Sequence, residues 1–182
     1  MNSFTWNRIW PLFENDDGSL PDIFIEGLTD EQTVQIYNWV LDRSSIYGEP
    51  TLWSIVEEKD IPVREIENPA QMFIDRKVEP FRHGLDNLVI EKVELPGLSI
   101  CVEAGGVSFD YRMGADWTKS CVEALFKFLS MLKSIGPNAR VFQADEGGHE
   151  SPNSLFEEAF QEYMKTHNKE GLEGRLAPPN QA

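Results

Sequence analysis

The residues that come closest to a metal-binding pattern are Asp145, Glu146 and His149, which occur together in one short loop. Carboxylate oxygens and imidazole nitrogens are ligands that proteins use for metal ions. To stack these ligands on one helical face, Gly147 and Gly148 would have to be helical, which glycine disfavours. We therefore expect a surface loop without a bound metal. If the protein is instead a small enzyme, this loop is the first place to look for its site.

Other catalytic patterns are missing from the sequence. His83, His149 and His167 lie in separate segments, and no two stand at the spacing of metal ligands. Cys101 and Cys121 have apolar neighbours, so we expect free thiols in a reducing compartment, and the sequence leaves a disulfide between them open. No G-x-S-x-G elbow and no glycine-rich loop opens a helix, so we expect no cofactor. Catalytic triads assemble in space, and spacing alone does not exclude one.

A second group of polar residues surrounds an expected strand-to-helix turn. Asp110 and Arg112 stand two positions apart, so they share one face of the expected strand and could form an ion pair there. Asp116 is placed to cap the helix that follows. The alternative is that Asp110 and Arg112 are exposed and recognise a partner.

The charge of the chain narrows the class of partner. The 182 residues include 16 basic and 31 acidic side chains, which gives a formal charge of −15. Such a surface repels phosphate backbones, so we expect no direct contact with nucleic acid. It attracts and orients a basic protein, such as a nuclease toxin. Excess acidic residues also favour solubility without any partner.

The N-terminal residues 1–21 form an aromatic arm. Trp6, Ile9, Trp10 and Phe13 follow helical spacing, but Pro11 interrupts a continuous helix. These aromatic side chains either fold back onto the domain or remain exposed as an anchor for a partner.

Six residues are the candidate partner-binding groups, because they are aromatic residues of the arm or charged residues of the expected loops and turns. They are Trp6, Trp10, Asp110, Arg112, Asp145 and Glu146.

The elements that must position these residues are clearest between residues 106 and 135. A strand with alternating apolar residues ends near Gly114, and a long amphipathic helix follows from about Trp117 to Ile135. Three strand-like runs at 88–95, 98–103 and 107–113 have short glycine-containing connections, which predict an antiparallel meander.

The remaining segments supply further strands and helices. Thr29 and Gln32 form a capping box, which predicts a helix from Asp30 to about Arg43. Residues 69–80 fit a short helix or a strand equally well. Strands are also expected at 22–28, 51–56, 61–66 and 140–144, a helix at 152–167, and a disordered tail at 168–182.

These patterns predict a single α+β domain over residues 22–167. It should contain a mainly antiparallel sheet of about five or six strands, two longer helices packed on one face, and a further C-terminal helix. No apolar run approaches the roughly 20 residues that span a bilayer, and no leader pattern is visible, so we expect a cytoplasmic protein that does not enter a membrane.

The leading functional hypothesis is a non-enzymatic acidic interaction protein, of the immunity or antitoxin type, that binds a basic partner protein. One alternative is a small enzyme with a site around the 145–149 loop. The other is a structural subunit that docks on a larger assembly through its aromatic arm.

Overall fold

The computed structural model describes residues 3–14 and 16–173. Its centre is a six-stranded sheet in the order β10-β1-β9-β8-β5-β2. Every neighbouring pair in this sheet is antiparallel. In sheet order the strands are β10 (Arg140–Ala144), β1 (Asp22–Glu26), β9 (Gly106–Tyr111), β8 (Leu98–Glu103), β5 (Phe81–Asp86) and β2 (Ser45–Ile46). The predicted α+β class and antiparallel sheet are confirmed.

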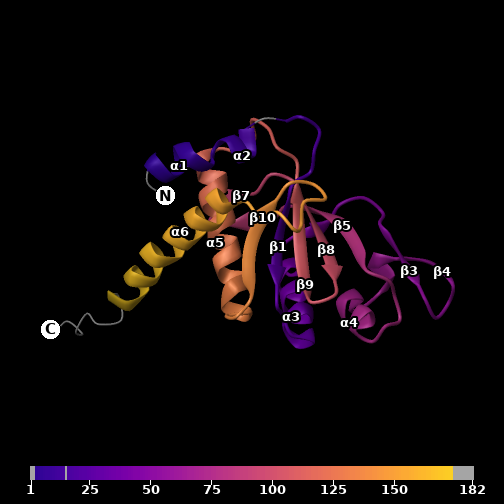
Figure 1. Cartoon of the computed structure of the whole chain (residues 1–182). Coiled ribbons are helices and arrows are strands. Elements are labelled where there is room, and N and C mark those ends of the chain that lie inside the picture. Colours follow the sequence, from indigo (N-terminus) through magenta and orange to yellow (C-terminus); the bar gives the residue numbers. More distant parts are fainter. Residues whose placement is uncertain (1–2, 15, 174–182) are drawn as a thin grey trace.

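Two long helices, α3 (Asp30–Leu41) and α5 (Lys119–Ile135), pack on one face of this sheet (Figure 1). The ring of Phe128 on α5 meets Phe109 of β9 edge-on at 5.2 Å between ring centroids, and lies 6.0 Å from Trp39 of α3. The C-terminal helix α6 (Ser154–Glu173) packs on α5 through Phe126 and Phe156, whose ring centroids are 5.3 Å apart. The predicted arrangement of helices is therefore confirmed.

The N-terminal arm forms two short helices, α1 (Ser3–Ile9) and α2 (Pro11–Glu14). Ile9 and Phe13 are fully buried. The Phe13 ring lies 5.2 Å from that of Tyr111 and 5.3 Å from that of Trp117. The Tyr111 hydroxyl also donates to the Leu12 carbonyl at 3.0 Å. The arm therefore folds back onto the domain and belongs to its core.

The sequence predicted the start of α3 correctly but not the start of α5. The capping box of Thr29 and Gln32 is present and begins α3, as predicted. Helix α5 begins at Lys119 and is capped by Thr118, so the predicted Asp116 cap is wrong. The Trp117 side chain is fully buried and its indole N–H donates to a backbone carbonyl at 2.8 Å. The backbone N–H groups of Trp117 and Thr118 bond to the carbonyls of Gly114 and Asp116, so this segment is a turn and the helix begins only at Lys119.

The sequence patterns predicted the elements between α3 and β8 least accurately. Its first hairpin pairs β3 (Thr51–Ser54) with β4 (Lys59–Pro62), as expected, and a 3-10 turn η1 (Val63–Glu65) follows. Residues 69–80 resolve to a short helix, α4 (Pro69–Ile74).

The predicted meander is wrong in its first strand. Strand β8 pairs with β5 and β9, whereas β6 (Val89–Ile90) and β7 (Val93–Glu94) form a separate small hairpin. Strand β5 carries no clear strand pattern, because Arg82, His83 and Gly84 interrupt its apolar residues. A side chain at Gly84 would crowd Tyr47, whose Cβ lies 3.1 Å from where a new Cβ would stand.

Helix α6 continues to Glu173, six residues past the predicted helix end at His167. The remainder of the expected disordered tail, residues 174–182, lies outside the described residues. Within residues 3–14 and 16–173, no helix has the length and apolar character that a membrane crossing requires.

Candidate functional site

The two faces of the central sheet differ in chemistry. Ile23 of β1 and Phe109 of β9 are paired across the strands and face the helices, so Asp22 and Asp110 point to the opposite face. A polar row crosses that face through Arg82, Cys101 and Ser108, which occupy paired positions on β5, β8 and β9. A buried polar group is costly unless it has a hydrogen-bond or charge partner, so the partners of these polar side chains are described next.

Arg82 lies between two acidic side chains, Asp22 and Asp110. Its Nη1 is 3.1 Å from Oδ2 of Asp110 and its Nη2 is 3.5 Å from Oδ1 of Asp22. The two carboxylates are nearly buried, and the oxygens that contact Arg82 lack hydrogen-bond geometry to any described partner. The pKa of Asp22 is raised above its ordinary value, mainly by burial. The charge of Asp110 also raises this pKa, whereas the charge of Arg82 opposes the shift. One guanidinium thus faces two carboxylates, which leaves excess negative charge on this face.

The ion pair expected between Asp110 and Arg112 does not form. Strand β9 ends at Tyr111, so Arg112 leaves the alternating pattern of the strand. Its guanidinium instead contacts Asp16 at 2.8 and 2.9 Å, and this pairing lowers the pKa of Asp16. Arg112 thus joins the end of the sheet to the segment that follows α2.

An acidic pocket opens at the end of the sheet where β1 begins and β10 ends. Its volume is about 490 Å³, and its acidic groups are Asp17, Asp145 and Glu146. The other lining residues come from α2, the segment before β1, the end of β9 and β10; they are Pro11, Leu12, Ser19, Pro21, Met113 and Gln143. None of these described lining residues is a lysine or an arginine. We call these nine lining residues the acidic pocket.

Local hydrogen bonds fix two of the pocket carboxylates. Oδ1 of Asp17 accepts from the Ser19 hydroxyl at 2.7 Å and from the Ser19 backbone at 3.0 Å. These bonds lower the pKa of Asp17, the hydroxyl contributing most, so this carboxylate is ionised at neutral pH. Oε2 of Glu146 accepts from the backbone N–H of Leu20 at 3.2 Å, which ties the 145–149 loop to the segment before β1.

Gln143 supplies a buried polar group at the pocket. Its side chain is 1% exposed, and its carbonyl oxygen has no hydrogen-bond partner among the described residues. Its amide nitrogen reaches the Ala144 carbonyl at 3.4 Å. Tyr111 stands nearby: burial raises its pKa, and the charge of Asp145 raises it further. A pocket lined by carboxylates suits a ligand that only donates hydrogen bonds, which is the property of ammonium and guanidinium groups.

His149 does not join the two acidic residues of its loop in a common site. Its Nε2 contacts the Glu26 carboxylate, and its ring meets Phe24 edge-on with 4.8 Å between centroids. Among the residues that the structure describes, no group of three or more histidine, cysteine or acidic side chains could hold a metal ion. The metal-ligand trio considered from the sequence is therefore not assembled.

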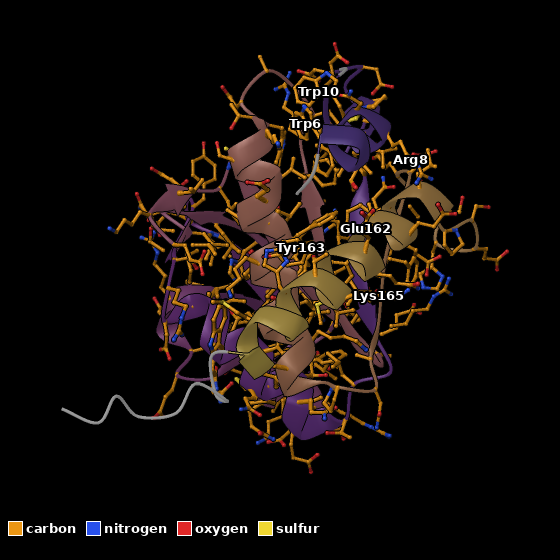
Figure 2. All side chains as sticks on the ribbon, turned by 90° about the vertical axis from the view of Figure 1, so that its left-hand side faces the viewer. Trp6, Arg8, Trp10, Glu162, Tyr163 and Lys165 are labelled. Carbon is orange, nitrogen blue, oxygen red and sulfur yellow. The ribbon has the colours of Figure 1, made fainter. Side chains whose placement is uncertain are left out.

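Trp6 and Trp10 lie at the end of the molecule where α1 crosses α6 (Figure 2). Both are half-buried and pack against the core, with their ring centroids 4.8 Å apart. Thr5 and Arg8 of α1 contact Glu162 and Glu158 of α6 at 2.8 and 2.6 Å. The two tryptophans are held by these contacts, and the residues that follow Trp10 form one wall of the acidic pocket.

The structure thus brings together only part of the predicted set. Asp145 and Glu146 share the acidic pocket, whereas Asp110 lies in the Arg82 cluster and Arg112 pairs with Asp16. Sequence reasoning missed Asp17, which looks like a turn residue, and Gln143, whose only signal is a polar side chain within an apolar strand.

The chain matches no protein-family model, no curated protein and no solved structure. Its own geometry and charge are therefore the basis for any proposal about its function.

Proposed function

We propose that this chain is a non-enzymatic interaction protein whose acidic pocket accepts a cationic side chain of a basic partner protein. An immunity or antitoxin-type inhibitor of a basic toxin belongs to this class. The observation that carries the proposal is the acidic pocket itself, in which Asp17, Asp145 and Glu146 surround about 490 Å³ without a cation among the described lining residues.

The chemistry of the pocket favours arginine or lysine over a neutral ligand. Hydrogen bonds between charged groups contribute about 1.5–3 kcal/mol each, roughly twice the contribution of neutral ones. An arginine would also present a planar fork of N–H donors that matches the geometry of carboxylates such as Asp145 and Glu146. The net charge of −15 adds long-range attraction, which raises the association rate and falls with ionic strength.

The cellular location is part of this proposal. Cys101 and Cys121 are both free thiols, a state that a reducing compartment maintains. A cytoplasmic inhibitor of a basic toxin would meet its partner there.

The experiment begins with affinity capture by the full chain at about 0.05 M salt, where surface charges are weakly screened. Each retained protein is purified, and its dissociation constant is measured by titration calorimetry at low and high salt. The same titration is repeated with the double variant Asp145→Asn/Glu146→Gln. Asp42→Asn/Asp86→Asn is the matched control, because it removes the same charge from exposed positions outside the acidic pocket.

We expect a strongly basic partner whose affinity falls as salt rises. The pocket variant should weaken binding by at least about tenfold, or 1.4 kcal/mol, while the control changes it little. Equal losses in the two variants would mean that net charge alone acts and would contradict the pocket. Retention of no basic protein, or binding that ignores ionic strength, would overturn the function itself.

A further inference from the structure

The β3–β4 hairpin stands away from α5 and α6, at the opposite side of the molecule (Figure 1). It is held along the edge of β3 by contacts with residues 77–79. The backbone N–H of Ile55 donates to the Lys77 carbonyl at 2.9 Å, and the Trp53 carbonyl accepts from Glu79 at 3.1 Å. An isolated bridge also pairs Ser54 with residue 78. The hairpin therefore presents its outer side chains in a fixed arrangement.

Three large apolar side chains of this hairpin face solvent. Trp53 is 42% exposed, Ile55 49% and Val56 69%. Leu52 and Ser54, which alternate with Trp53 along β3, are buried and anchor the hairpin to the domain. An exposed tryptophan on a rigid element is a frequent centre of binding energy in protein interfaces, because little entropy is lost when it binds.

A groove of about 590 Å³ lies along β4, and one of its lining residues, Asp60, is paired with Trp53 across the hairpin. Its rim carries four carboxylates and one ammonium, and its floor includes Ile61, Ile66 and Met72. The acidic residues of the rim are Glu57, Asp60, Glu65 and Glu67. We call this set, together with the three exposed apolar residues, the hairpin surface.

The charges of the hairpin surface are poorly compensated within the chain. The ammonium of Lys59 pairs with Glu57 at 2.7 Å. In the described part of the chain, no ion pair joins Asp60 or Glu67 to a cation, and the charge of Glu65 acts on the same ammonium, Lys59, that already pairs with Glu57. Lysine and arginine lay their aliphatic stems on apolar surface while their charged ends reach carboxylates, so a groove with an apolar floor and an acidic rim fits them.

We propose that the hairpin surface docks an amphipathic, positively charged segment of a partner protein. The inference rests on the proposed function for the charge of the partner, and it adds a second contact surface with an apolar component. A second copy of this chain is a poor occupant, because two acidic rims would repel each other across the contact.

The test uses two peptides of equal length and charge: a lysine–leucine peptide and a lysine–serine peptide. Both are titrated into the full chain and followed by ¹⁵N-resolved NMR. If the hairpin surface is the binding site, the lysine–leucine peptide should bind at least about tenfold more tightly than the lysine–serine peptide. It should also shift the Trp53 indole N–H resonance. Trp53→Ser/Val56→Ser should abolish this preference. Val89→Ser/Leu155→Ser, which alters two exposed apolar residues elsewhere, should preserve it.

Equal affinity for the two peptides, or a preference that survives Trp53→Ser/Val56→Ser, would overturn the inference. If Asp145→Asn/Glu146→Gln weakens lysine–serine binding while the hairpin variant changes nothing, the inference fails and the proposed function stands. If neither peptide binds, both fail. A dimer in sedimentation that the hairpin variant dissociates would assign the surface to self-association instead.

Discussion

Replacement of Phe13 by alanine tests whether the N-terminal arm is part of the folded core. Phe13 is fully buried, and its ring packs against those of Tyr111 and Trp117, with centroids 5.2 and 5.3 Å away. Removing a buried phenylalanine side chain costs about 3–5 kcal/mol, through lost burial and the cavity that remains. The stability of a domain is only about 5–15 kcal/mol, so Phe13→Ala removes a large fraction of it.

The assay is urea unfolding followed by circular dichroism, with a thermal scan alongside. At roughly 2–4 °C per kcal/mol for a chain of this size, we expect the Tm to fall by roughly 6–20 °C. Leu20→Ala is the control: Leu20 is 36% exposed and precedes β1, so its removal should cost within about 0.5 kcal/mol. A cost below about 1 kcal/mol for Phe13→Ala would show that the arm is detached from the core in solution, contrary to this prediction.

Three further predictions follow from single residues. Gly106→Ala should destabilise by about 3 kcal/mol in urea unfolding, the upper end of the usual cost of overpacking, because the new Cβ would lie 2.2 Å from a β1 carbonyl oxygen, whereas Gly97→Ala should be nearly neutral. Burial raises the pKa of Asp22, so its charged form costs stability as pH rises above about 4; unfolding at two pH values should show Asp22→Asn gaining relative stability toward pH 7. Burial lowers the pKa of His83, whose Nε2 lies 2.9 Å from the Tyr37 hydroxyl, so stability should fall as pH drops below about 6.5, and His83→Gln should flatten that dependence.

The sequence predicted those helix starts and turns that depend only on residues a few positions apart. The Thr29–Gln32 capping box begins α3, and the glycine turn at Gly105 joins β8 and β9, because each feature acts within a few residues. Strand β5 escaped prediction because His83 is buried by its tertiary contact with Tyr37, which no local pattern encodes.

The candidate site was predicted less completely than the fold. Asp145 and Glu146 are adjacent in sequence and were identified, but Asp17 joins them only because the segment before β1 crosses the end of β10. Asp110 pairs with Arg82 of β5 and not with Arg112, because the sheet order places only one strand, β8, between β5 and β9. Such contacts depend on strand order, which the sequence does not show directly.

An NMR titration with N-acetylarginine amide asks whether the acidic pocket binds a guanidinium group. The neutral citrulline analogue, which has nearly the same shape, is the control ligand. We expect the arginine compound to shift the Gln143 side-chain amide and the Asp145 and Glu146 backbone resonances, with a dissociation constant on the order of 1 mM, about −4 kcal/mol. The citrulline analogue, or the Asp145→Asn/Glu146→Gln variant, should give no such shifts. Equal shifts with both compounds, or shifts outside the acidic pocket, would contradict the account.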